Sequence, residues 1–100
     1  MTSINIGKVK VSAEILRALT HPLRLEILDY IDKHHVVNVK SIYKELDLKQ
    51  SITSQHLQIL RQAGLVITKR DGKFINYAID YSKIRDAVNA IDRFSSEVTE

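Results

Sequence analysis

The sequence predicts a small, mainly helical domain that carries one β-hairpin near its C-terminal end. Residues 12–64 place apolar side chains at the three- and four-residue spacing of amphipathic helices. Residues 65–80 change to alternating β-branched and aromatic residues around Asp71–Gly72, a pattern typical of a hairpin. Residues 82–98 return to helical spacing. A chain of 100 residues with this order is expected to form one domain, residues 1–100.

The N-terminal third is expected to contain an arm and two helices. Residues 1–10 are predicted to be a flexible arm, and Ser12 to cap a first helix that ends at Leu19. Pro22 suits the first position of a second helix, because proline lacks the N–H group that would be unpaired there. That helix is expected to reach about Lys33, with an inward face of Leu23, Ile27, Leu28 and Ile31.

Residues 38–64 read as two further helices with a tight turn between them. Asn38 is a suitable N-cap, because its side-chain oxygen can accept from a free N–H group of the first turn. Asp47–Leu48–Lys49 interrupts the helical spacing, and Ala63–Gly64 closes the second helix, with Gly64 as a left-handed cap. The apolar face of the first of these helices is formed by Val39, Ile42, Tyr43 and Leu46.

The second of these helices has an unusual polar face. Leu57 and Leu60 point to the core, whereas the opposite side carries amides and hydroxyls in place of the usual Glu and Lys. Such side chains both donate and accept hydrogen bonds, as the reading of base edges in a major groove requires. The alternatives are an ordinary solvated face and, for one threonine, a structural role. The predicted contacts are Gln50, Ser51, Thr53, Ser54 and Gln55.

The charge distribution also favours a nucleic-acid partner. The net charge is only +3, but residues 39–74 hold seven basic and three acidic residues, whereas residues 75–100 hold three basic and five acidic ones. Clustered basic charge is the footprint that phosphate binding leaves. Further phosphate contacts are expected from Arg61 and, at the hairpin tip, from Lys69, Arg70 and Lys73. His56 is expected either to contact phosphate or to position its helix.

The order of four helices, a basic hairpin and a last helix predicts a winged helix-turn-helix. Its fourth helix would enter the major groove, and the hairpin would lie along the backbone or in the minor groove. The first and last helices carry more apolar surface than one small core needs, so we expect a homodimer; packing within one chain is the alternative. The predicted interface is Ile15, Leu16, Leu19, Ile84, Val88, Ile91 and Phe94.

Three segments resemble the ArsR/SmtB family of bacterial repressors: ALTHPLRLEIL (18–28), SITSQHLQILRQAGLV (51–66) and RDGKFINYAI (70–79). The resemblance covers about residues 12–98. It implies a homodimer joined by its first and last helices, which binds a near-palindromic operator and is released by an inducer, often a metal ion. The N-cap of the fourth helix, often Ser in the family, is Lys49 here, which adds a charge near phosphate.

The metal sites of that family are not intact in this chain. The thiolate sensor aligns with Asn38 and Lys40, and the chain has no cysteine. The sensor of the last helix aligns with Asp80, Ser82, Arg93 and Ser96, of which one is a ligand type. A site built from His21, His34, His35 and Asp32 is the remaining alternative, against a capping histidine and two loop histidines. No metal or cofactor is therefore predicted.

Several functional classes are not expected. No apolar run approaches the roughly 20 residues of a membrane helix, and residues 1–10 lack the apolar core of a signal peptide, so a cytoplasmic protein is expected. The chain shows no Ser/His/Asp order and no glycine-rich phosphate loop, which argues against an enzyme. The prediction is a dimeric, operator-binding repressor. The rival is a winged-helix module that binds only other proteins. The sequence does not identify an inducer for the predicted repressor.

Overall fold

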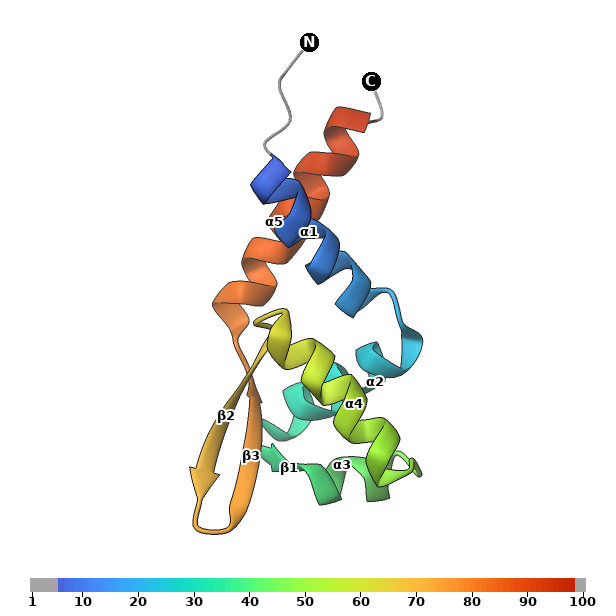
Figure 1. The fold of residues 1–100 in the computed structure, drawn as a ribbon, viewed down its shortest axis with the longest axis vertical. Helices are drawn as coiled ribbons and strands as arrows, with labels where there is room; N and C mark the ends of the chain where they lie inside the picture. Colours follow the sequence, from blue (N-terminus) through green and yellow to red (C-terminus); the bar gives the residue numbers. More distant parts are fainter. Residues whose placement is uncertain (1–5, 99–100) are drawn as a thin grey trace.

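The computed structural model describes residues 6–98, with side chains described for residues 13–90 and 92. In this range the order is α1 (Ile6–Leu19), α2 (Pro22–His34), β1 (Val37–Asn38), α3 (Val39–Glu45), α4 (Gln50–Gln62), β2 (Val66–Asp71), β3 (Phe74–Ile79) and α5 (Tyr81–Val98). α1 and α5 cross and project beyond the body of α2, α3 and α4, and β2 and β3 form a hairpin at the opposite end (Figure 1). The predicted helical fold with a hairpin wing is confirmed.

The first helix begins earlier than predicted. α1 starts at Ile6, so the expected flexible arm is wrong for residues 6–10; residues 1–5 lie outside the described range. Ile6, Val9 and Ala13 extend the helical spacing of the later residues toward the N-terminus. Ser12 therefore lies within the helix and does not cap it.

α2 begins with a side-chain cap, as predicted. The backbone N–H of Leu23 donates to Nδ1 of His21 at 3.1 Å, and Pro22 occupies the first helical position. The capping alternative for His21 is therefore confirmed. α2 ends at His34, after which His35 adopts a φ of 68° and its N–H donates to the carbonyl of Ile31.

The turn between α3 and α4 depends on one left-handed residue. Asn38 accepts from the N–H of Ser41 at 2.8 Å and so caps α3 as predicted. Asp47 has a φ of 53°, which short polar side chains tolerate. This conformation lets the N–H of Leu48 donate to the carbonyl of Tyr43 at 2.8 Å and turns the chain toward α4.

α4 ends in a Schellman motif, which confirms the predicted glycine cap. Gly64 has a φ of 78°. Its N–H donates to the carbonyl of Arg61 at 2.9 Å, and the N–H of Leu65 donates to the carbonyl of Leu60 at 3.0 Å. A Cβ at Gly64 would lie 3.2 Å from Cε of the flexible Lys83 side chain, so the positive φ is the main reason for glycine at this position.

The hairpin is part of a three-stranded antiparallel sheet in the order β1-β3-β2. The sequence did not predict β1, because two residues show no period; Val37 pairs with Tyr77, far along the chain. The predicted turn residues are also shifted. Asp71 pairs with Phe74, so the loop is Gly72–Lys73, and of Asp71 and Gly72 only Gly72 has a positive φ, at 62°. Glycine in the first loop position fits a type II′ turn.

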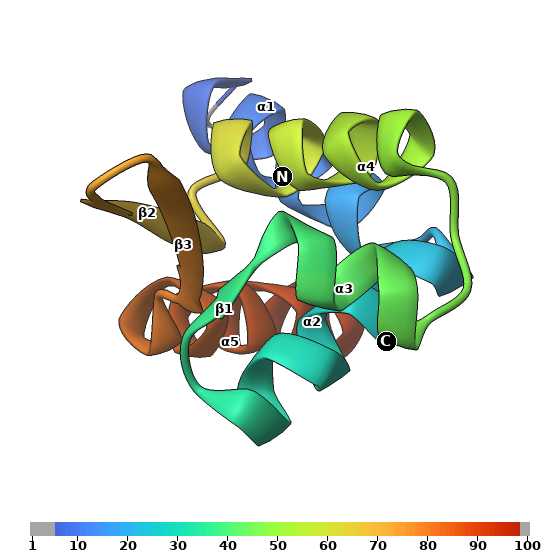
Figure 2. The same cartoon turned by 90° about the horizontal axis from the view of Figure 1, so that it is seen from below.

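One hydrophobic core joins the helices to the base of the sheet. Figure 2 shows α4 and α1 on one side of the domain and α2, α3 and α5 on the other. The fully buried aliphatic side chains between them are Ala18, Ile27, Ile31, Ile42, Leu57, Leu60 and Leu65. Over the described residues, no helix has the length and apolar content needed to cross a membrane.

Candidate nucleic-acid interface

The two sides of α4 differ in chemistry. Its inward side is closed by Thr53, Leu57 and Leu60, each fully buried. Its outward side begins at the N-terminal end with exposed amide and hydroxyl groups. This end and the hairpin tip both lie at the end of the molecule away from the projecting ends of α1 and α5, on opposite sides of it (Figure 1). The exposed polar residues that the sequence predicted here are Gln50, Ser51, Ser54 and Gln55.

Thr53 is not part of this exposed surface. It is 0% exposed, and its Oγ1 donates to the carbonyl of Lys49 at 3.0 Å. A buried hydroxyl with its hydrogen bond made has no capacity to read a base, so the prediction of Thr53 as a DNA contact is wrong. The physical reason is its position four and seven residues before the buried Leu57 and Leu60, which places it on the inward side of the helix.

The start of α4 has no side-chain cap. Lys49 occupies the N-cap position without a capping bond from its side chain. The first intrahelical bond runs from the N–H of Thr53 to the carbonyl of Lys49. The preceding N–H groups point out of the helix end, where the helix dipole favours an anion such as phosphate. The exposed Lys49 ammonium adds a full positive charge there.

Two exposed residues of α4 were missed by the sequence analysis. Gln58 lies one turn after Ser54 and Gln55, so the same helical spacing extends the amide surface toward it. Ile52 is 38% exposed between the polar residues, although an isoleucine in a helix suggests a core position. An apolar side chain at this place has the chemistry to contact a thymine methyl group.

His56 is held at the seam between α4 and α2. Nη1 of Arg24 donates to Nδ1 of His56 at 3.2 Å, and the ring centroids of His21 and His56 are 4.6 Å apart. Burial, and then the neighbouring His21 and Arg24, hold the pKa of His56 below its usual value. Of the two predicted roles, the structure supports the positioning of the helix. Arg24, which is 6% exposed, was not predicted, although it lies three and seven residues before Ile27 and Ile31 on the inward face.

The basic residues of the wing do not form one cluster. Lys69, Arg70 and Lys73 are all exposed, and Lys73 lies in the loop. Lys69 and Arg70 are successive strand residues, so their side chains leave opposite faces of the hairpin. They therefore cannot both face one phosphate row in the same way. Arg61 is exposed in the last turn of α4, at the far end from Gln50.

The predicted dimer surface is partly supported by exposure. Leu16 is 37% exposed and Val88 is 47% exposed, while Leu19 and Ile84 are half-buried. Ile15 is 7% exposed and belongs to this chain's own core, so its assignment to the interface is wrong. The side chains of Ile91 and Phe94 lie outside the described ones.

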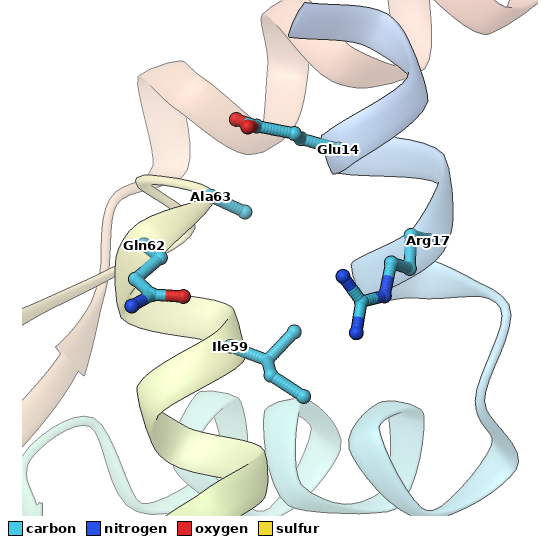
Figure 3. A pocket seen from close by; sticks show the side chains of 5 residues that line it. All are labelled: Glu14, Arg17, Ile59, Gln62 and Ala63. Carbon is cyan, nitrogen blue, oxygen red and sulfur yellow. The ribbon is translucent and has the colours of Figure 1, made fainter.

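Two hollows border these helices. A hollow of about 120 Å³ lies between α1 and α4, where Glu14 and Arg17 face Ile59, Gln62 and Ala63 (Figure 3). A larger one of about 330 Å³ is mainly apolar and adjoins Val88. Its walls are Leu19, Leu25, Leu28, Asp29, Asp32, Ile79, Tyr81, Ile84 and Val88.

Polar groups at the start of α5 fix this helix against α2. The hydroxyl of Tyr81 donates to Oδ1 of Asp32 at 2.6 Å, and this bond raises the pKa of Tyr81. Oδ1 of Asp80 accepts from the N–H of Lys83 at 3.1 Å, and this bond lowers the pKa of Asp80. Asp80, which aligns with a family metal ligand, thus caps α5. Among the described side chains, no three histidine or acidic groups converge on one point.

Comparison with known proteins agrees with the geometry. Residues 21–68 match the profile described as bacterial regulatory protein, arsR family. The chain is 37% identical over 81 residues to the transcriptional repressor PagR of Bacillus anthracis, covering 80% of each chain. It is 29% identical over 75 residues to the transcriptional repressor SdpR of Bacillus subtilis, covering 75% of this chain and 82% of SdpR.

Solved structures show the same fold. The crystal structure of PagR superposes with a TM-score of 0.71 at 32% identity, covering 87% of this chain and 99% of PagR. An ArsR-like regulator from Rhodococcus sp. RHA1 superposes with a TM-score of 0.81 at 22% identity, covering 93% of this chain and 87% of that one. The second likeness concerns the fold alone.

Proposed function

This chain belongs to the ArsR family of bacterial regulatory proteins, and we propose from that premise that it represses transcription by binding an operator with α4. It is a winged-helix transcriptional regulator. The observation that supports operator reading is the outward side of α4, where amides and hydroxyls are exposed and the acidic groups of an ordinary solvated helix are missing. This surface supplies donors and acceptors at the helix end that enters a major groove.

The residues proposed to read bases are those that are exposed near the N-terminus of α4. Gln side chains can pair with adenine through two hydrogen bonds, and serines let the helix approach the bases closely. The proposed set is Gln50, Ser51, Ser54, Gln55 and Gln58. Phosphate contacts, which supply most of the affinity, are proposed for Lys49, Arg61, Lys69, Arg70 and Lys73. Lys69 and Arg70 leave opposite faces of the hairpin, so they would reach different phosphates.

A homodimer is the proposed binding form. The exposed Leu16 and Val88 lie on the two helices that cross, and the apolar hollow beside Val88 extends the uncovered surface. Two copies related by a two-fold axis would present two α4 helices to half-sites about one helical turn apart, which makes a near-palindromic operator the expected target. We propose cytoplasmic action and release by an inducer that does not use the family's metal positions.

The test is the binding of labelled duplexes by fluorescence anisotropy. The protein first selects duplexes from a random library, and the best one is compared with a shuffled duplex of the same composition at two salt concentrations. We expect one dimer per site, a strong preference for the selected duplex, and affinity that falls steeply with salt. Failure to enrich any sequence, or equal binding to both duplexes, would contradict operator binding. No binding at low salt would favour the protein-binding module.

A further inference from the structure

Arg24 is a nearly buried cation that caps α1. Its Nε donates to the carbonyl of Ala18 at 2.9 Å, and its Nη2 donates to the carbonyl of Arg17 at 2.7 Å. Both carbonyls belong to the last turn of α1, where the helix offers them no partner and carries a negative partial charge. The charge of Arg24, 6% exposed, is therefore stabilised by the end of a helix. No carboxylate pairs with Arg24, because the ion pair found in the described part of the chain joins Lys33 to Asp29.

The third contact of Arg24 reaches the helix proposed to read DNA. Its Nη1 lies 3.2 Å from Nδ1 of His56 on α4. A guanidinium only donates, so Nδ1 must be the acceptor, and the proton of a neutral His56 must lie on Nε2. One side chain from α2 thus holds the end of α1 and the middle of α4 together.

Two basic residues lie close to the His56 ring. Arg24 faces it from α2, and the ring of His21, before α2, lies 4.6 Å away between centroids. From α1, Arg17 and Glu14 line the neighbouring hollow against α4. Nδ1 of His21 already accepts from the N–H of Leu23. A proton on Nδ1 of His56 would remove the acceptor and place a second cation beside Arg24.

We propose that Arg24 is a positioning residue for operator binding: through Nδ1 of His56 it sets α4 relative to α1, and acidification breaks this link. The inference rests on the proposed function. Burial, and then the neighbouring His21 and Arg24, lower the pKa of His56, so the link is complete at neutral pH. A histidine ring without these neighbours has a pKa of about 6.5. The link is therefore complete above that pH and is lost as the pH falls through the lower pKa of His56 in the folded protein.

A measurement without DNA tests the link itself. Nitrogen–proton correlation spectra of the histidine rings distinguish a protonated Nε2 from a protonated Nδ1. We expect His56 to be the neutral Nε2–H form at neutral pH and to titrate below the usual pKa of a histidine. In Arg24→Lys, which keeps a charge but loses the planar fork, we expect the Nδ1 signal of His56 to shift and its titration to change. A His56 that is protonated on Nδ1 at neutral pH, or unaffected by Arg24→Lys, would overturn the link.

Three variants of His56 separate positioning from direct contact with DNA. In His56→Asn the amide oxygen replaces Nδ1 and accepts from Arg24 at every pH. In His56→Gln the amide group instead reaches the place of Nε2. His56→Ala removes both. With the duplex selected by the wild-type protein, we expect roughly tenfold weaker binding for His56→Ala at neutral pH, the scale of a hydrogen bond to a charged group, and recovery of most of this loss by His56→Asn alone.

The pH profile supplies the readout that a merely structural role would not change. As the pH falls from 8 through the lowered pKa of His56, the ratio of wild-type to His56→Asn affinity is expected to fall, by about tenfold once the ring is fully protonated, because charges that are common to both proteins cancel. His34→Asn, at an exposed histidine on the far end of α2, serves as the control and should follow the wild-type profile.

Recovery by His56→Gln in place of His56→Asn would assign His56 to phosphate and overturn the positioning role. So would a constant ratio of wild-type to His56→Asn affinity over the pH range. If the wild-type protein selects no duplex, the proposed function fails instead, and the ring spectra still decide whether Arg24 holds His56.

Discussion

α4 and α5 are both amphipathic helices, yet their exposed sides carry different chemistry. α4 exposes amides and hydroxyls along its first turns, whereas α5 exposes Val88 beside an apolar hollow. A surface of hydrogen-bond donors and acceptors recognises a partner specifically only when that partner is also polar. An apolar surface lowers the free energy only when another apolar surface covers it. The comparison is in keeping with the proposed partners, which are DNA for α4 and a second chain for α5.

The largest expected effect concerns the support of α4. Leu57→Ala removes a fully buried side chain and should lower the free energy of unfolding by about 2–5 kcal/mol. Urea denaturation measures it. Gln58→Ala, at the adjacent exposed position, should change it by less than about 0.5 kcal/mol. Equal effects at the two positions would mean that α4 does not separate a core side from a free side.

The next effect tests the apolar side of α5. Val88→Asp would bury a carboxylate at the proposed dimer interface, and because an ion loses several kcal/mol on desolvation, we expect the dimer dissociation constant to rise on the order of a hundredfold. Sedimentation equilibrium measures this constant. Ile75→Asp is a matched control, because Ile75 on the wing is 48% exposed against 47% for Val88. Loss of the dimer in both variants, or in neither, would contradict the assignment.

A smaller effect tests the polar side of α4. Gln55→Ala should cost about 1–3 kcal/mol of binding to the selected duplex and relax the preference at one base step, with stability retained. Gln62→Ala makes the same change at the other end of the helix and should leave the preference unchanged. Selection experiments with each variant give the answer. A change caused only by Gln62→Ala would mean that the C-terminal end of α4 faces the bases.

The smallest effect concerns the wing. Lys73→Ala should weaken all duplexes alike and reduce the slope of log affinity against log salt by about 1, because one phosphate contact is lost. Anisotropy at several salt concentrations measures the slope. Lys33→Ala removes an exposed lysine of α2 that already pairs with Asp29, and it should leave the slope unchanged. A sequence-dependent loss in Lys73→Ala would instead indicate base contact by the wing.

Local features of this chain were predictable, because each depends on a few neighbouring residues. The caps at His21 and Asn38, the left-handed Gly64 and the hairpin follow from hydrogen bonds within a single turn. The two errors in local structure also have local causes. α1 extends to Ile6 because the helical spacing continues there, and the hairpin loop moves by one residue because the register pairs Asp71 with Phe74.

The sequence by itself determined the fold class, the family and the end of α4 that offers amides and hydroxyls, because periodicity and side-chain chemistry are written along the chain. Only the tertiary structure decided that Thr53 and Ile15 are core residues, that β1 pairs with β3, and that Arg24 joins three helices. These properties depend on contacts between residues that are distant in sequence. Local patterns leave them undecided, because burial and long-range pairing exist only after the elements have packed.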